Sequence, residues 1–106
     1  MTPREAAQTI AERLRQEMAA EEVWLFGSQA RGNATPDSDI DVVAVVADSK
    51  ESRYRRAVAA HGLLSDVKFP KDVIVLTRQE WEKELKVPSS LSSTVVREGI
   101  LLSHAS

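Results

Sequence analysis

The sequence predicts an α/β (or α+β) domain in which a small mixed β-sheet is flanked by helices. Short apolar runs rich in β-branched residues alternate with longer segments whose apolar residues recur every three to four positions. The chain has 106 residues, of which 42% are hydrophobic and 28% charged, so it can build one hydrophobic core but not two. No repeat or linker divides it, and we expect residues 1–106 to form a single domain.

The first expected element is a helix from Pro3 to Met18. Thr2 can cap its first turn, Pro3 suits the first helical position, and Glu5 completes a capping box with Thr2. Apolar residues then recur every four positions and form one stripe: Ala6, Ile10, Leu14 and Met18. The short apolar run 22–27 ends in glycine and predicts a buried strand.

A polar connector, residues 28–38, leads to the next strand. Its first residues can form one helical turn, and Gly32, Asn33 and Pro36 are typical turn residues. The β-branched run "DIDVVAVVAD" predicts a strand from Asp39 to Asp48.

A second helix is expected from about Lys50 to Leu64, capped by Asp48 or Ser49. One side of it carries most of its larger apolar residues: Tyr54, Ala57, Val58, His61 and Leu64. The three arginines of "SRYRR", residues 52–56, indicate either a solvated helix face or a contact with RNA or phosphate, and the overall acidity favours the solvated face.

The rest of the chain predicts a strand, two helices and a short terminal strand. The strand covers Lys71–Thr77 and the first of these helices covers Arg78–Leu85. The last helix stops at Gly99. We expect Trp81, which lies between charged residues, to be half-exposed.

Two aspartates stand at the entrance of the second strand. Because side chains alternate along a strand, Asp39 and Asp41 share a face with Val43 and Val45 and lie about 7 Å apart at Cα. Two carboxylates at this separation repel each other, and burial makes the repulsion costlier. A divalent cation removes this cost, and Mg²⁺ prefers oxygen ligands. The pair therefore predicts a metal site for phosphoryl or nucleotidyl transfer.

A third carboxylate can come from the strand that follows. Asp72 opens the run "KDVIVLT", so a neighbouring strand would bring it to the same edge of the sheet, where it could hold a second metal ion and accept a proton. Asp66 is the competing candidate, but it lies at the end of the preceding helix.

The step Gly27-Ser28 supplies the complementary half of such a site. A glycine directly after a strand lets the backbone turn tightly and approach a ligand. The amide groups of the following turn and the Ser28 hydroxyl can donate to phosphate oxygens, and Arg31 can neutralise phosphate charge.

With these residues the chain resembles the DNA polymerase beta-type nucleotidyltransferase superfamily, and within it the small prokaryotic minimal nucleotidyltransferases. Their signature is Gly-Ser, ten residues, then Asp-x-Asp; here Gly27-Ser28 is followed by the ten residues 29–38 and by "DID". The resemblance extends through "KDVIVLT" to "VVREGILLS". Gln29 departs from it, since many relatives have arginine there.

The resemblance implies a polymerase beta-like fold and a transfer of AMP from ATP to a hydroxyl, with release of pyrophosphate. It implies that Asp39, Asp41 and Asp72 form the catalytic triad and bind Mg²⁺, with two ions expected. It also implies that Gly27 and Ser28 hold the phosphates of the nucleotide.

The resemblance further implies a partner, a separately encoded helical toxin of the HEPN type. In such toxin–antitoxin pairs the transferase is the antitoxin and can adenylylate (AMPylate) a tyrosine of the toxin. Two other functions stay open: a non-catalytic antitoxin that acts by binding, and a free-standing transferase for a small molecule or nucleic acid. The oligomeric state also stays open.

Composition excludes several classes of protein. The chain has no cysteine, so disulfides and thiolate chemistry are excluded. Its net charge of −2 argues against direct nucleic-acid binding. The N-terminus lacks the apolar core of a signal peptide, and no apolar run is long enough to cross a membrane, so we expect a cytoplasmic protein with no membrane partner.

Overall fold

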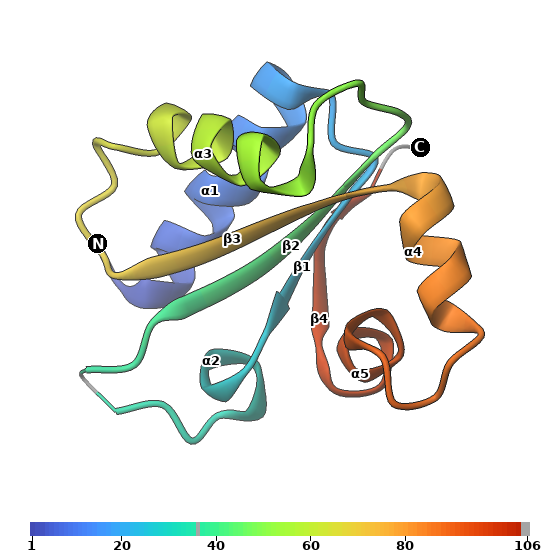
Figure 1. Cartoon of the computed structure of the whole chain (residues 1–106). Coiled ribbons are helices and arrows are strands. Elements are labelled where there is room, and N and C mark those ends of the chain that lie inside the picture. Colours follow the sequence, from blue (N-terminus) through green and yellow to red (C-terminus); the bar gives the residue numbers. More distant parts are fainter. Residues whose placement is uncertain (36, 105–106) are drawn as a thin grey trace.

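Five helices and four strands make up the computed structural model, which describes residues 1–35 and 37–104 (Figure 1). Their order along the chain is α1 (Pro3–Met18), β1 (Glu22–Phe26), α2 (Ser28–Arg31), β2 (Ile40–Val46), α3 (Arg53–Leu63), β3 (Lys71–Thr77), α4 (Arg78–Leu85), α5 (Leu91–Glu98) and β4 (Ile100–His104). Pro36, expected in a turn, lies outside the described residues.

The strands form one mixed sheet in the order β3-β2-β1-β4. β1 pairs antiparallel with both β2 and β4, whereas β2 and β3 are parallel and are connected through α3. The expected small mixed sheet flanked by helices is confirmed.

Helices cover both faces of this sheet. α1 and α3 pack on one face, and α4 and α5 pack on the other (Figure 1). Ile40, Val42 and Ala44 of β2 belong to the core on the α1/α3 side. Val43 and Val45 belong to a second cluster on the α4/α5 side. The alternation expected for this strand is therefore confirmed. The expectation of a single core is wrong, because helices cover both faces of the sheet and each face buries its own cluster.

Several local predictions are confirmed to the residue. In α1 the Thr2 hydroxyl accepts from the Glu5 N–H at 3.1 Å, and the Glu5 carboxylate accepts from the Thr2 N–H at 2.7 Å. The bounds of β3 and α4 are those expected. α5 ends before Gly99, where a Cβ would lie 2.8 Å from the Leu25 carbonyl oxygen, so the turn into β4 can pass close to β1.

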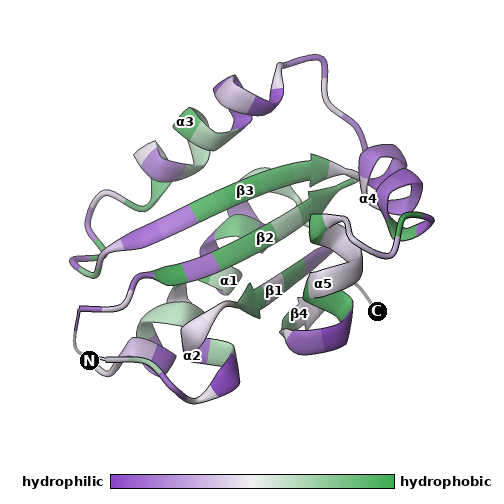
Figure 2. Ribbon diagram, turned by 60° about the horizontal axis from the view of Figure 1, so that its bottom comes forward, coloured by the Kyte–Doolittle hydropathy of each residue, from purple (hydrophilic) through white to green (hydrophobic). Residues whose placement is uncertain are grey.

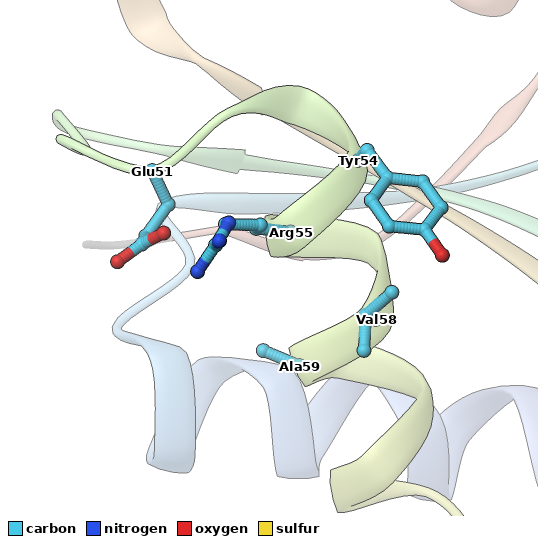
Figure 3. Close-up of a pocket in the computed structure, with 5 residues that line it drawn as sticks. All are labelled: Glu51, Tyr54, Arg55, Val58 and Ala59. Carbon is cyan, nitrogen blue, oxygen red and sulfur yellow. The ribbon is translucent and has the colours of Figure 1, made fainter.

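The prediction for α3 was wrong in its start, and two residues of the apolar side that it singled out are exposed. The helix begins at Arg53 and is capped by Ser52, whose hydroxyl accepts from the Arg55 N–H at 3.1 Å. Tyr54 is 77% exposed and Val58 53% exposed. Figure 3 shows both on the outer surface of α3, where they line a shallow depression.

The inward side of α3 carries an arginine instead. Arg56 is buried and donates to the Val75 carbonyl at 2.8 Å and to both carboxylate oxygens of Glu80 at 2.7 and 3.0 Å. Its charge is tolerated inside the protein because these acceptors satisfy it. The expectation of a solvated face is therefore wrong for Arg56, while Arg53 and Arg55 are exposed.

Trp81 was also placed wrongly. It is buried and stacks on Trp24, with ring centroids 5.9 Å apart. Of its charged neighbours, Glu82 is exposed and Glu80 pairs with the buried Arg56, so the polarity of the local sequence was a poor guide to the burial of Trp81.

Candidate functional site

The predicted site residues lie at the edge of the sheet where β1 ends and β2 and β3 begin. This follows from the strand directions, since β1 is antiparallel to β2 and β2 is parallel to β3. In the register, Phe26 pairs with Asp41 and Asp41 pairs with Asp72. Gly27 and Ser28 follow Phe26 directly, so both halves of the predicted site are brought together.

Asp41 is the half-buried centre of the carboxylate group. Burial raises its pKa, and the neighbouring charges of Asp72 and Asp39 raise it further, while the Arg31 charge acts in the opposite direction. Asp39 and Asp72 are exposed. Figure 2 shows the start of β3 and a segment near the start of β2 as hydrophilic, next to strands that are otherwise hydrophobic.

The expected strand started at Asp39, but β2 begins one residue later, at Ile40. Asp39 therefore stands on the loop that enters the strand rather than on the strand itself.

Asp39, Asp41 and Asp72 lie at the same edge of the sheet, but their side chains are not close enough together to bind one metal ion as three ligands. Within residues 1–35 and 37–104, no group of three or more His, Asp or Glu side chains is gathered closely enough to hold a metal ion. Mg²⁺ usually takes only one or two protein carboxylates and completes its shell with water and phosphates. The donor set suits this ion, because the like charges around half-buried Asp41 are what a divalent cation would offset.

Gly27 meets a steric requirement that glycine alone satisfies. Its φ is +73° with ψ −156°, a conformation that other residues rarely adopt. A Cβ at this position would also collide with Oδ2 of Asp41. The turn therefore presses the backbone against the central carboxylate.

The single helical turn α2 starts immediately after this glycine. In the part of the chain that the structure describes, no side chain caps its N-terminus. The backbone N–H groups of Ser28 and Gln29 are consequently available to an external acceptor such as a phosphate oxygen. Gly32, with φ +79°, ends the turn.

Arg31 stands at the other end of α2. Its guanidinium is about half exposed and lies 4.0 Å from a Glu98 carboxylate oxygen at the end of α5. Glu98 was not singled out from the sequence, and no local pattern signals it, because the contact depends on how α5 packs beside β1. Arg31 is thus near both Asp41 and a second carboxylate.

Asp66, the competing third carboxylate, is engaged elsewhere. It forms an ion pair with Arg13 of α1, which also donates to the Leu63 carbonyl at 3.2 Å. The hydrogen bond from Arg13 lowers the pKa of Asp66. Asp72, not Asp66, is the residue in register with Asp41.

Comparison with known proteins agrees with this geometry. The sequence profile of the family described as "Nucleotidyltransferase domain" matches residues 7–102, nearly the whole chain. The chain belongs to the nucleotidyltransferase domain family. No protein of curated function matches it in sequence.

Solved structures share the fold of this nucleotidyltransferase domain. A candidate nucleotidyltransferase from Sulfolobus solfataricus is 25% identical, with a TM-score of 0.60 over 92% of this chain and 76% of the other. A chain of a toxin–antitoxin complex with AMP-PNP is 24% identical, with a TM-score of 0.61 over 93% of this chain and 73% of the other. A chain of a mutant MntA–HpeT toxin–antitoxin complex is 20% identical, with a TM-score of 0.57 over 93% and 73%.

These likenesses establish the family and the fold, and the nucleotidyltransferase domain indicates a transferase. In addition, no helix among the described residues is both long and apolar enough to cross a membrane.

Proposed function

We propose that this domain is a Mg²⁺-dependent nucleotidyltransferase that moves AMP from ATP onto a hydroxyl of a HEPN-type helical toxin, with a tyrosine as acceptor. In this proposal the chain is the antitoxin of the pair. One observation supports this chemistry above the others. The Gly27 backbone lies against the carboxylate of Asp41, and Asp41 pairs with Asp72 on the neighbouring strand.

The phosphate half of the site is built from backbone groups. The Ser28 and Gln29 N–H groups at the start of α2 and the Ser28 hydroxyl would donate to oxygens of the triphosphate. Arg31, exposed at the end of α2, would neutralise part of its charge. Gln29 is no obstacle to this role, because its contribution is a backbone N–H.

The carboxylate half is built from Asp39, Asp41 and Asp72, which would hold Mg²⁺. When bound, the metal would offset the charge that develops on the phosphates. Asp72, exposed beside Asp41, would accept the proton of the attacking hydroxyl.

The proposed reaction is a direct displacement at the α-phosphorus of ATP. The acceptor oxygen forms a bond to this phosphorus, and the bond to the bridging oxygen of the leaving group breaks. The products are an adenylylated acceptor, pyrophosphate and one proton.

The assignment of a toxin as acceptor rests on two supports. The sequence resembles the minimal nucleotidyltransferases, and two of the structures that share its fold are toxin–antitoxin complexes, one of them with AMP-PNP.

The test combines the chain, ATP labelled on the α-phosphate, Mg²⁺ and the product of the neighbouring gene. We expect label on a tyrosine of that product with wild type and none with Asp39→Asn. Absence of Asp39-dependent label would contradict the proposed reaction.

A companion assay separates the other two functions. If Asp41→Asn neutralises the toxin as well as wild type, the chain acts by binding alone. If label appears on a small molecule or nucleic acid without any helical partner, the chain is a free-standing transferase.

A further inference from the structure

Arg31, the cation beside the phosphate-binding turn, has a carboxylate at its side. It ends α2, a single turn in which none of the four residues is buried, and its guanidinium is about half exposed. A long, exposed arginine samples many rotamers, and ordering it on a ligand reduces the affinity. In the part of the chain that the structure describes, its ion pair is with Glu98, at 4.0 Å. This carboxylate restricts the directions in which the arginine points.

The backbone of Glu98 is fixed against β1. Glu98 is the last residue of α5, and the next residue, Gly99, passes so close to β1 that a Cβ there would lie 2.8 Å from the Leu25 carbonyl oxygen. Leu25 also pairs with Ile100, the first residue of β4. Because Leu25 lies two residues before Gly27, the strand end that carries the phosphate-binding turn also holds the backbone of Glu98.

The Glu98 carboxylate lies between two cations. Its Oε1 is the atom near Arg31, and its Oε2 lies 4.0 Å from the guanidinium of Arg97. Arg97 is tied to its own helix and to the loop before it, since it donates to the Thr94 hydroxyl at 3.5 Å and to the Pro88 carbonyl at 3.4 Å. The carboxylate is therefore oriented with one oxygen toward each cation.

Helix energetics alone do not favour an acid at this position. The C-terminal end of a helix carries a partial negative charge, so a cation is favourable there and an anion is not. Arg97 follows this rule, whereas Glu98, at the last position of α5, does not. The charge of Glu98 thus has a stabilising use toward Arg31 on the neighbouring α2 rather than within α5 itself.

We infer that Glu98 is a positioning residue, which holds the Arg31 guanidinium beside the phosphate-binding turn in readiness for the triphosphate. The inference rests on the proposed function and deepens it, because it adds a residue outside the glycine-serine turn and the aspartates. The held guanidinium also lies near the carboxylates, since its charge opposes the rise in the pKa of Asp41. Glu98 acts through Arg31 and need not touch the nucleotide.

The test is a double-mutant cycle on the affinity of the whole chain for ATP with Mg²⁺, measured by calorimetry. We expect Glu98→Gln to bind ATP about threefold more weakly than wild type, a size typical of an exposed ion pair. In an Arg31→Ala background the same substitution should have no effect, because the group that Glu98 holds is gone. Glu82→Gln, which removes an exposed acid on α4, is the matched control and should bind like wild type.

Transfer kinetics give a second readout, which a loss of folded protein would not reproduce. With the product of the neighbouring gene as acceptor, Glu98→Gln should raise KM for ATP and leave kcat unchanged, since Arg31 binds the phosphates equally in the ground state and the transition state. A fall in kcat at unchanged KM would overturn the inference.

The binding cycle separates this inference from the proposed function. If Glu98→Gln binds ATP as tightly as wild type or more tightly, or loses as much affinity in the Arg31→Ala background, the role of Glu98 is refuted and the proposed transfer stands. If wild type binds ATP but labels no acceptor, the proposed transfer fails and the cycle still decides the role of Glu98. A wild type that does not bind ATP overturns both.

Discussion

The backbone of Gly27 lies directly against the carboxylate of Asp41, which ties the phosphate-binding turn to the centre of the carboxylate group. Any side chain at position 27 would meet Oδ2 of Asp41. The phosphate-binding turn and the carboxylate group are therefore in direct contact, so a substitution in one should change the geometry of the other.

The first prediction concerns this contact. Gly27→Ala forces an L-residue into a conformation with positive φ and extended ψ that is almost confined to glycine, which costs about 1–3 kcal/mol, and pushes the Asp41 carboxylate aside. We expect the variant to lose Mg²⁺-dependent ATP binding, measured by calorimetry. Gly32→Ala is the control, because Gly32 has a similar φ of +79° but open space around it. Gly32→Ala should lose less stability in urea unfolding than Gly27→Ala, because Gly32 is in the ordinary left-handed region and has no clash, and it should still bind ATP. Equal binding by both variants would refute the steric argument.

A trade-off between stability and function is expected at Asp41. Its pKa is raised by burial and by Asp72 and Asp39, so the ionised group destabilises the fold. A carboxyl with a raised pKa contributes most favourably below its unfolded pKa, near 3.8, and that contribution declines as pH rises through the folded pKa. Asp41→Asn should therefore increase the free energy of unfolding at pH 7 relative to wild type, with a smaller gain at pH 4.

The same variant should weaken Mg²⁺-dependent ATP binding by at least about tenfold. Asp37→Asn, in the exposed loop before the site, serves as the control for loss of one charge and should change neither quantity. If Asp41→Asn has a lower free energy of unfolding than wild type at pH 7, the ionised carboxylate does not destabilise the fold.

The pair Arg56–Glu80 should make the fold sensitive to acid. The hydrogen bonds from Arg56 lower the pKa of Glu80 from 4.5 to about 2. A group with a lowered pKa stabilises the fold at pH values above its unfolded pKa, and this stabilisation is lost as pH falls through its folded pKa. The contribution of Glu80 should therefore disappear between about pH 4.5 and 2. Because the Glu80 side chain is 38% exposed, solvent reduces the effect.

Glu80→Gln should cost about 1–2 kcal/mol at neutral pH, since it leaves the buried Arg56 cation without its counter-charge. Urea unfolding from pH 6 to 2 measures this, and the variant should lack the part of the acid dependence that belongs to Glu80. Glu82→Gln, exposed on the same helix, should behave as wild type. Parallel pH profiles for all three proteins would contradict the assignment.

Arg31 should contribute to nucleotide affinity and little to stability. Arg31→Ala removes an exposed cation beside the phosphate turn, and we expect about a tenfold weaker affinity for ATP. Its unfolding free energy should change by less than about 0.5 kcal/mol, because the contact with Glu98 is exposed. Arg55→Ala, an exposed arginine on α3, is the control. If both variants bind ATP alike, Arg31 has no role in binding the phosphates.

The sequence alone determined those features that depend on neighbours in the chain. The capping box of Thr2 and Glu5 needs only three residues of separation, and the alternation in β2 needs only the period of a strand. The bounds of β3 and α4 and the short turn after Gly27 were accessible for the same reason, and the order of helices and strands along the chain indicated the mixed sheet.

Only the tertiary structure decided which distant groups meet. The sequence favours Asp72 over Asp66 because Asp72 opens a strand, but its place directly opposite Asp41 depends on the register in which β2 and β3 pair. Arg56 was wrongly expected on a solvated face because a buried arginine is unfavourable by itself and becomes acceptable only with Glu80, which α4 supplies. Trp81 of α4 is buried because it stacks on Trp24, which belongs to β1. Periodicity records the polarity of single residues, whereas these outcomes depend on partners that the fold brings together from far along the chain.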